Sequence, residues 1–226
     1  MNDAPVLRAE EVWRVFRREG YDVEVLKGIS LSIGRGETVG VVGVSGAGKT
    51  TLLQILGTLD RATSGKILFD GRDVTGLPEE ELALLRNRKI GFVFQFHNLL
   101  PEFSVLENVM LPCRIAGMDR EEARGRAESL LAEVGLSRRA SHRVGEVSGG
   151  EQQSAAVCRA LVMEPAVLLA DEPTGNLDRG TAFGMVDLLL ELNRSRGLSL
   201  LMLTHNDHVA SRLHRVVRID DGRIVA

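Results

Sequence analysis

A glycine-rich stretch constrains this chain more than any other feature. Residues 43–51 read GVSGAGKTT, and they lie between the apolar runs 38–42 and 52–56. The pattern G-x-x-x-x-G-K-[ST] in this setting predicts a strand, a phosphate-binding loop and a helix. Glycine suits such a loop because the backbone must come close to phosphate, often with a positive φ. The amides that open the following helix would face the same anion.

Two side chains of this loop have expected roles in nucleotide binding. Lys49 is expected to reach the β- and γ-phosphates, and the Thr50 hydroxyl to bind Mg²⁺, which prefers oxygen ligands. An ordinary glycine-rich turn between strand and helix is the less favoured alternative, because the flanking runs are correct. The predicted nucleotide-binding residues are Gly43, Ser45, Gly46, Ala47, Gly48, Lys49, Thr50 and Thr51.

Length and charge limit the classes of protein to consider. With 226 residues, 44% of them hydrophobic, the chain can form one elaborated α/β domain or two lobes that share a core. Lys and Arg number 28 against 31 Asp and Glu, so the net charge is −3. This composition gives no general basic field, and we therefore expect no nucleic-acid partner.

Cysteine content and hydropathy bear on the cellular setting. Cys113 and Cys158 are too few for a disulfide framework or a zinc site, which suits a reducing cytosol, and both are predicted to be buried. Residues 1–11 lack the apolar core of a signal peptide. We expect no transmembrane segment, because no run approaches ~18 apolar residues. Any membrane role is therefore expected to come through a partner.

Apolar patterns predict two groups of strands. Alternation over 6–16 and 23–33 predicts antiparallel strands, and residues 65–71 join them in a small β layer. Short apolar runs predict buried parallel strands in the core. These core strands are expected at 38–42, 89–94, 166–170 and 198–203, with a closing hairpin at 216–225.

Helical patterns fall mainly in the middle of the chain. Residues 78–88 and 181–193 predict helices, and residues 119–135 predict a further helix with one apolar face. Asp119 and Glu122 are expected to form a capping box at its start, and Gly135 to end it. Residues from about 98 to 160 therefore look like a helical insertion into an α/β core.

Polar residues follow three of the predicted core strands. Gln95, the pair Asp171 and Glu172, and His205 each stand where an apolar strand ends, which is the edge where open α/β sheets bind ligands. Asp171 is expected to hold the Mg²⁺ of a nucleotide. Glu172 could accept a proton from an attacking water. The alternative for either acid is a surface charge or a helix cap.

The stretch VSGGEQQ at residues 147–153 predicts the start of another helix. Ser148 is expected to cap it, with Glu151 three residues later, and two glycines leave the amides uncovered. Such an end is a second potential anion site. Taken alone, the stretch indicates only a capped helix.

Together these motifs resemble those of the ABC ATPase family, in the family's order and over nearly the whole chain. They are the Walker A loop 43–50, the Q-loop residue Gln95, the signature 147–151, Walker B ending at Asp171 with Glu172, the D-loop 176–178 and the switch residue His205. The resemblance adds Ser148, Gly149, Gly150 and Asp178 to the nucleotide-binding residues. Phe16 falls where the family has an aromatic residue that stacks on adenine; the alternative is an apolar residue of the β layer.

The resemblance implies an α/β fold: a P-loop NTPase core of mostly parallel strands, with an antiparallel β layer and a helical insertion. Residues 1–226 would form one ABC ATPase domain, with 1–97 and 161–226 as the nucleotide-binding core and 98–160 as the helical subdomain. It implies ATP and Mg²⁺ as cofactors, with Thr50, Gln95 and Asp171 at the metal. The implied catalytic residues are Lys49, Gln95, Glu172 and His205.

The same resemblance implies partners. Two copies would pair head to tail on ATP, each site being completed by the other copy's signature motif. Integral membrane permease subunits would contact residues 96–106, from Phe96 to Leu106, and hold the chain peripherally at the cytoplasmic face of the inner membrane. Three residues depart from the family pattern: Val147 replaces leucine, Ser154 replaces arginine, and Asn206 replaces aspartate.

Within the family, residues 91–109 and 170–178 look most like the ATPase subunits of lipoprotein-releasing transporters. Two alternatives stay open: the ATPase of a macrolide-exporter-type efflux system, and a cell-division-type scaffold that uses ATP to hold a membrane protein in a signalling state. A DNA-repair ATPase is disfavoured, because no long heptad segment interrupts the chain.

Overall fold

An antiparallel sheet forms the first layer of the structure, a computed structural model that describes residues 4–18 and 20–225. Strands β1 (Leu7–Arg18) and β2 (Tyr21–Ile33) form a hairpin, and β4 (Ser64–Phe69) pairs with the other edge of β1. The short strand β5 (Arg72–Asp73) completes the order β2-β1-β4-β5. The predicted antiparallel layer is confirmed.

A six-stranded sheet forms the centre, in the order β10-β9-β3-β8-β7-β6. Its members are β3 (Thr38–Val42), β6 (Ile90–Phe94), β7 (Val167–Asp171), β8 (Ser199–Leu203), β9 (Arg215–Asp220) and β10 (Arg223–Val225). Every neighbouring pair is parallel except β9 and β10. The nearly unbroken apolar runs of β3 and β8 fit this position, because both strands are buried along their whole length. The predicted mostly parallel core is confirmed.

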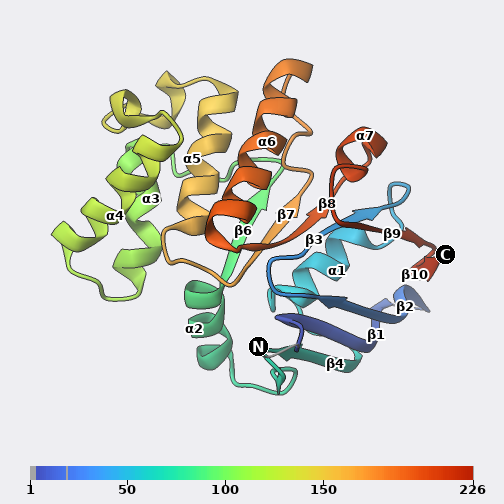
Figure 1. The fold of residues 1–226 in the computed structure, drawn as a ribbon. Coiled ribbons are helices and arrows are strands. Elements are labelled where there is room, and N and C mark those ends of the chain that lie inside the picture. Colours follow the sequence, from blue (N-terminus) through green and yellow to red (C-terminus); the bar gives the residue numbers. More distant parts are fainter. Residues whose placement is uncertain (1–3, 19, 226) are drawn as a thin grey trace.

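Helices cover the central sheet, and those of the middle of the chain gather on one side. Figure 1 shows α3, α4 and α5 together, on the side of the molecule opposite the β1, β2 and β4 layer. The helices are α1 (Lys49–Leu56), α2 (Glu79–Lys89), α3 (Val105–Ile115), α4 (Arg120–Glu133), α5 (Gly149–Leu161), α6 (Arg179–Arg196) and α7 (Asp207–Ala210), with 3-10 turns η1 (Ser137–Arg139) and η2 (Val144–Glu146).

Two helix ends differ from the sequence predictions. In α4, the Asp119 carboxylate accepts from the Glu121 amide, but the expected capping box with Glu122 is wrong. The Glu122 carboxylate instead pairs with Arg126, one turn later, at 3.0 Å. Helix α6 is longer than the predicted 181–193, because Asp178 caps its start and Gly197, with a φ of 63°, ends it.

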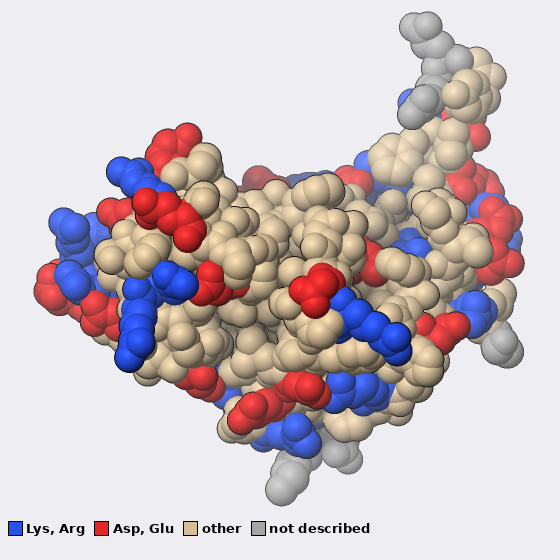
Figure 2. Space-filling model, turned by 90° about the horizontal axis from the view of Figure 1, so that it is seen from above, with Lys and Arg blue, Asp and Glu red and all other residues tan. Residues whose placement is uncertain are grey.

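Alternate side chains of the central strands belong to two different hydrophobic cores. Leu168 and Met202 pack with the helices of the middle segment, whereas Leu169 and Leu201 pack against α1 and the antiparallel layer. Cys113 and Cys158 are both buried, as predicted. Figure 2 shows the surface from above: basic and acidic side chains are interspersed over it, at the rim and near the middle, with uncharged areas between them.

Candidate functional site

A pocket of about 480 Å³ lies at the edge where the parallel strands β3, β6, β7 and β8 end. It brings together residues from all four strand ends, as expected for the edge where open α/β sheets bind ligands. Its lining residues are Val25, Gly43, Val44, Ser45, Gly46, Gly48, Lys49, Thr50, Thr51, Gln95, Asp171, Glu172 and His205.

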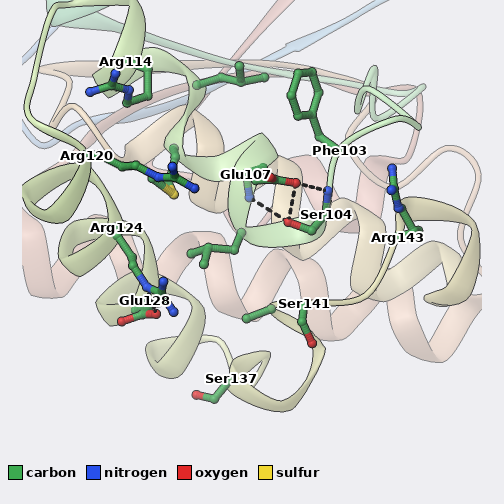
Figure 3. Close-up of a pocket in the computed structure, with 14 residues that line it drawn as sticks. Phe103, Ser104, Glu107, Arg114, Arg120, Arg124, Glu128, Ser137, Ser141 and Arg143 are labelled. Carbon is green, nitrogen blue, oxygen red and sulfur yellow. Dashed lines mark hydrogen bonds and ion pairs between the residues drawn. The ribbon is translucent and has the colours of Figure 1, made fainter.

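A larger hollow, of about 600 Å³, lies in the helical segment between α3, α4 and η1. Figure 3 shows arginines on its rim, one of which, Arg124, pairs with Glu128 at 2.8 Å. Phe103, Ser104 and Leu106 from the predicted permease-contacting stretch also line it. None of the predicted nucleotide-binding, catalytic or metal-binding residues lines this hollow.

The glycine-rich loop has the backbone that its sequence predicts. Gly46 and Gly48 have φ angles of 82° and 101°, which L side chains adopt only with strain. A Cβ on Gly48 would also lie 2.8 Å from the Val25 carbonyl oxygen. The Lys49 ammonium donates to the carbonyl oxygens of Gly43 at 2.8 Å and Val44 at 3.0 Å. The lysine is thus held across the mouth of the loop.

The Thr50 side chain, at the start of α1, faces the Asp171 carboxylate at the end of β7, and both line the pocket. Burial raises the pKa of Asp171, and the neighbouring charge of Glu172 raises it further; the Thr50 hydroxyl and the charge of Lys49 act in the opposite direction. A buried carboxylate of this kind favours a nearby cation. The arrangement therefore suits a metal ion with oxygen ligands.

Glu172 and His205 form the polar wall opposite the loop. His205 Nδ1 lies 3.0 Å from Glu172 Oε1, and Glu172 is the more buried of the two. Glu172 has a φ of 46°, a left-handed conformation that costs free energy in a residue with a side chain. Its amide donates to the Leu203 carbonyl at 3.1 Å, which fixes this bend to the end of β8. Such strain is common at functional sites.

Gln95 is tied to the segment that follows Glu172. Gln95 Nε2 donates to Asn176 Oδ1 at 3.1 Å, and Asn176 Nδ2 donates back to the Gln95 carbonyl at 3.0 Å. A Cβ on Gly175 would lie 2.9 Å from the Gln95 side chain, so glycine permits this close contact. The Gln95 and Glu172 segments therefore form one hydrogen-bonded unit.

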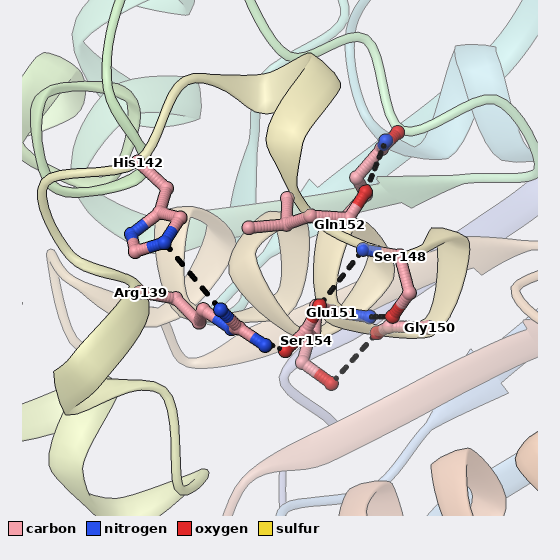
Figure 4. A network of polar contacts seen from close by, with 8 residues as sticks. Arg139, His142, Ser148, Gly150, Glu151, Gln152 and Ser154 are labelled. Carbon is pink, nitrogen blue, oxygen red and sulfur yellow. Dashed lines mark hydrogen bonds and ion pairs between the residues drawn. The ribbon is translucent and has the colours of Figure 1, made fainter.

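The predicted signature residues lie outside the pocket, at the start of α5 (Figure 4). Ser148 Oγ accepts from the Glu151 amide at 3.3 Å, and Glu151 Oε2 accepts from the Ser148 amide at 2.8 Å, so the predicted capping box is confirmed. Arg139 donates to the other Glu151 oxygen at 2.8 Å. These contacts lower the pKa of Glu151, the Ser148 amide contributing most. Gly149 and Gly150 follow, with Gly149 exposed.

Three other predicted residues also lie outside the pocket lining. Asp178 accepts from the Gly180 and Thr181 amides and so caps α6. Ala47 is buried beneath the loop, where its carbonyl accepts from the Gly222 amide at 3.1 Å. Phe16 lies on β1, and the guanidinium of Arg14 stacks 4.3 Å from its ring centroid.

The departures from the family pattern have local structural accounts. Val147 is buried, so an apolar side chain is kept there. Ser154 Oγ donates to the Gly150 carbonyl at 3.0 Å within α5. Asn206 caps α7 by accepting from the His208 and Val209 amides.

Sequence reasoning did not find Val25, and it gave no role to Val44 inside the predicted loop 43–50; both residues line the pocket. Val25 comes from β2 and carries no motif, so only the packing of the antiparallel layer against the loop reveals it. Gln153, whose contacts are described below, was also missed. It stood inside the signature stretch without an assigned role.

Comparison with known proteins agrees with this geometry. Residues 26–175 match the family model described as ABC transporter. The "Lipoprotein-releasing system ATP-binding protein LolD" of Syntrophus aciditrophicus is 55% identical over 97% of this chain and 99% of its own length. The protein of the same name from Aquifex aeolicus is 50% identical over 98% of this chain and 97% of its own length. That from Coxiella burnetii is 48% identical over 99% of this chain and 97% of its own length.

Solved structures give the same result. A bacterial ABC transporter cassette, described as dimeric, has a TM-score of 0.90 and 38% identity, covering 97% of each chain. A post-hydrolysis dimer of the same cassette, described as bound to ADP and Pi, has a TM-score of 0.90 and 37% identity, again over 97% of each chain. On the family match and these identities, the chain belongs to the ABC transporter family, as one of its ATP-binding proteins.

Proposed function

We propose that this chain is the ATP-hydrolysing subunit of an ABC transporter that powers release of lipoproteins from the inner membrane toward the outer membrane. The main observation in support is that one pocket, at the ends of parallel strands, contains Lys49, Asp171, Glu172 and His205. The cargo rests on the names of the relatives, which favour lipoprotein release over efflux or a cell-division scaffold.

The residues divide the work of phosphoryl transfer. Lys49 would exchange its bonds to loop carbonyls for bonds to the β- and γ-phosphates, while the amides of the loop and of α1 hold the remaining oxygens. Glu172 would accept a proton from the attacking water, and His205, at 3.0 Å from it, would help to orient the γ-phosphate and the water. The post-hydrolysis relative with ADP and Pi supports hydrolysis as the reaction.

We further propose that Thr50, Asp171 and Gln95 hold Mg²⁺. Their hydroxyl, carboxylate and amide oxygens match the preference of this ion, and burial of Asp171 leaves a carboxylate that a cation would stabilise. The ion would neutralise charge on the phosphates. Among the residues that the structure describes, no three His, Cys, Asp or Glu side chains form a metal cluster.

The active form would be a head-to-tail dimer that assembles on ATP. Ser148, Gly149 and Gly150 lie outside the pocket on accessible surface, so they are free to meet the nucleotide of a second copy. The dimeric state of the related cassettes supports this arrangement. Phe16 and Asp178 would likewise act at the edge of that interface, toward adenine and across the dimer.

Membrane permease subunits would be the partners, contacted by residues 96–106. Phe96 is 70% exposed, and Leu100 and Phe103 are also exposed. Exposed apolar side chains that lie close together often mark a protein-binding surface. In the described part of the chain no helix is long and apolar enough to cross a bilayer. We propose peripheral attachment at the cytoplasmic face of the inner membrane through these partners, with residues 98–160 as the helical subdomain that they contact.

One measurement tests the enzyme proposal: ATPase activity of the purified chain against its concentration, with Glu172→Gln beside it. The rate per molecule should rise with concentration if two copies complete each site. Glu172→Gln should bind ATP and hydrolyse it on the order of 10²- to 10⁴-fold more slowly. Wild-type turnover by this variant would remove Glu172 from its role.

A second measurement tests the partner proposal. Substitution of Phe96 and Phe103 by serine should leave the soluble ATPase rate unchanged but abolish its response to co-purified permease subunits and lipoprotein release from vesicles. Loss of ATP binding would instead assign this stretch to the nucleotide-binding core.

A further inference from the structure

Gln153 connects three segments of the proposed active site that are far apart in sequence. It lies in the second turn of α5 and is only 1% exposed. Its Nε2 donates to the carbonyl oxygens of Phe94 at 3.3 Å and Pro173 at 2.8 Å. Phe94 immediately precedes Gln95, and Pro173 immediately follows Glu172. One amide group therefore holds the backbone next to both pocket residues.

The position of this amide relative to the sheet explains its effect. Strands β6 and β7 are paired up to Phe94 and Asp171, where their parallel ladder ends. Gln153 bonds to Phe94, the last residue of β6, and to Pro173, two residues beyond the end of β7. The separation of the two strand ends is thus set by a side chain of α5 as well as by the ladder.

Other contacts bind the same segments to one another and to α5. Gln95 and Asn176 exchange hydrogen bonds, as described above. From α5, Arg159 donates to the carbonyl oxygens of His97 at 2.8 Å and Asn98 at 2.6 Å. Helix α5 therefore holds the backbone on both sides of Gln95 by hydrogen bonds from its side chains.

The unpaired atom of Gln153 indicates why an amide occupies this position. Its Oε1 is buried and has no hydrogen-bond partner among the described residues. An unpaired buried acceptor costs free energy, which an apolar side chain of similar size would avoid. The two carbonyls would then lose their donor. The donor group is therefore the part of this side chain that the fold uses.

We propose that Gln153 is a positioning residue for ATP hydrolysis, which fixes Gln95 and Glu172 relative to each other and to the start of α5. The inference rests on the proposed function, since it assumes that these two residues act on the nucleotide. A displacement of either strand end would pass through this amide to the helix that begins with Gly149 and Gly150. Gln153 itself is not among the residues that line the nucleotide pocket.

The test substitutes Gln153→Met, which keeps the length of the side chain and removes the donor. We expect the ATPase rate at saturating ATP to fall about 10- to 100-fold, because a small displacement of a catalytic group has effects of this size. The dissociation constant for ATP should change less than about threefold, because the phosphate loop is untouched. Gln153→Asn, which keeps the amide one methylene short of its partners, should give a smaller fall in rate.

Asn193 offers a matched control. It is a buried amide on α6 whose Nδ2 also donates to two carbonyl oxygens, those of Gly36 at 2.9 Å and Leu198 at 2.5 Å. These carbonyls precede β3 and β8, at the opposite edge of the sheet from the pocket. Asn193→Leu should lower the melting temperature as Gln153→Met does, yet keep the ATPase rate within about twofold of the wild type.

The outcomes separate this inference from the proposed function. A wild-type chain without ATPase activity at any concentration would overturn the proposed function. An active wild type with equal rates for Gln153→Met and Asn193→Leu would overturn the inference alone. If Gln153→Met does not fold, Gln153→Asn decides: a stable variant with the wild-type rate rejects the positioning role.

Discussion

The starts of helices α1 and α5 are both glycine-rich, yet they are built in opposite ways. Gly48 precedes α1 in a left-handed conformation, and no side chain among the described residues caps the helix. Ser148 precedes α5 in an extended conformation, and it shares a complete capping box with Glu151. The first end opens into the 480 Å³ pocket, whereas the second lies on the surface outside it.

The difference shows how much of an anion site each end supplies. At α1 the backbone amides stay uncapped and Lys49 lies beside them, so one chain provides both dipole and charge. At α5 the capping box already uses the amides of Ser148 and Glu151. The amides of Gly149 and Gly150 remain for a ligand. The start of α5 can therefore complete the nucleotide site of a second copy but is too weak to form a nucleotide site by itself, which fits the proposed dimer.

The largest expected effect comes from removing the charge at α1. Lys49→Met should raise the dissociation constant for ATP about 100-fold, because charge-assisted hydrogen bonds contribute ~1.5–3 kcal/mol each. Fluorescent ATP-analogue binding to dilute protein measures it, with Lys66→Met on β4 as the control lysine. Unchanged affinity in Lys49→Met would mean that the loop amides alone hold the phosphates, and the contrast with α5 would weaken.

A bulky residue at the start of α5 should separate binding from hydrolysis. Among the described residues, nothing lies within 4 Å of a Cβ built on Gly149, or on Gly125 of α4, so a side chain has room at both positions. Gly149→Leu should leave ATP binding by dilute protein unchanged and lower hydrolysis at least about tenfold, by blocking the second copy. Gly125→Leu should leave both unchanged. Equal hydrolysis in the two variants would contradict the composite site.

The sequence predicted the α1 site more fully than the contacts that support it. The loop is specified by local residues, because its glycines need positive φ angles, and the strand-end rule brought Asp171, Glu172 and His205 to it. Val25 and Gln153 reach their places only through packing between distant segments. No local pattern encodes that packing.

The wrong capping box in α4 shows a different limit. Asp119 and Glu122 have the required spacing, but Arg126 lies one turn beyond Glu122 and pairs with its carboxylate. Ser148 and Glu151 have the same spacing, and there Arg139 binds the second carboxylate oxygen without displacing the first. A spacing rule identifies the candidate pair, whereas a third charged residue decides whether the pair forms.

Asp171 at the end of β7 and Glu151 in the first turn of α5 should affect stability with opposite sign. The pKa of Asp171 is raised, so its contribution to stability is full at low pH and is lost as pH rises through that pKa. The pKa of Glu151 is lowered, so its contribution is present above the unfolded-state value and is lost as pH falls through the lowered value.

Without Mg²⁺ at neutral pH, Asp171→Asn should therefore raise the melting temperature and Glu151→Gln should lower it. Both differences should shrink as the pH falls toward the acid range. Thermal unfolding between pH 4 and 8 measures them. A loss of stability in Asp171→Asn at neutral pH would show that the Thr50 hydroxyl and the charge of Lys49 outweigh burial.

The smallest effect concerns the cap that distinguishes α5. Ser148→Ala should cost about 1 kcal/mol of folding free energy, a fall of about 2–4 °C in melting temperature for a chain of this size. Ser104→Ala is the matched control, because Ser104 and Glu107 form the same capping box at the start of α3. Both variants should lose similar stability, but only Ser148→Ala should lower hydrolysis. If both lower it equally, helix fraying explains the loss, and the start of α5 needs no role toward a second nucleotide.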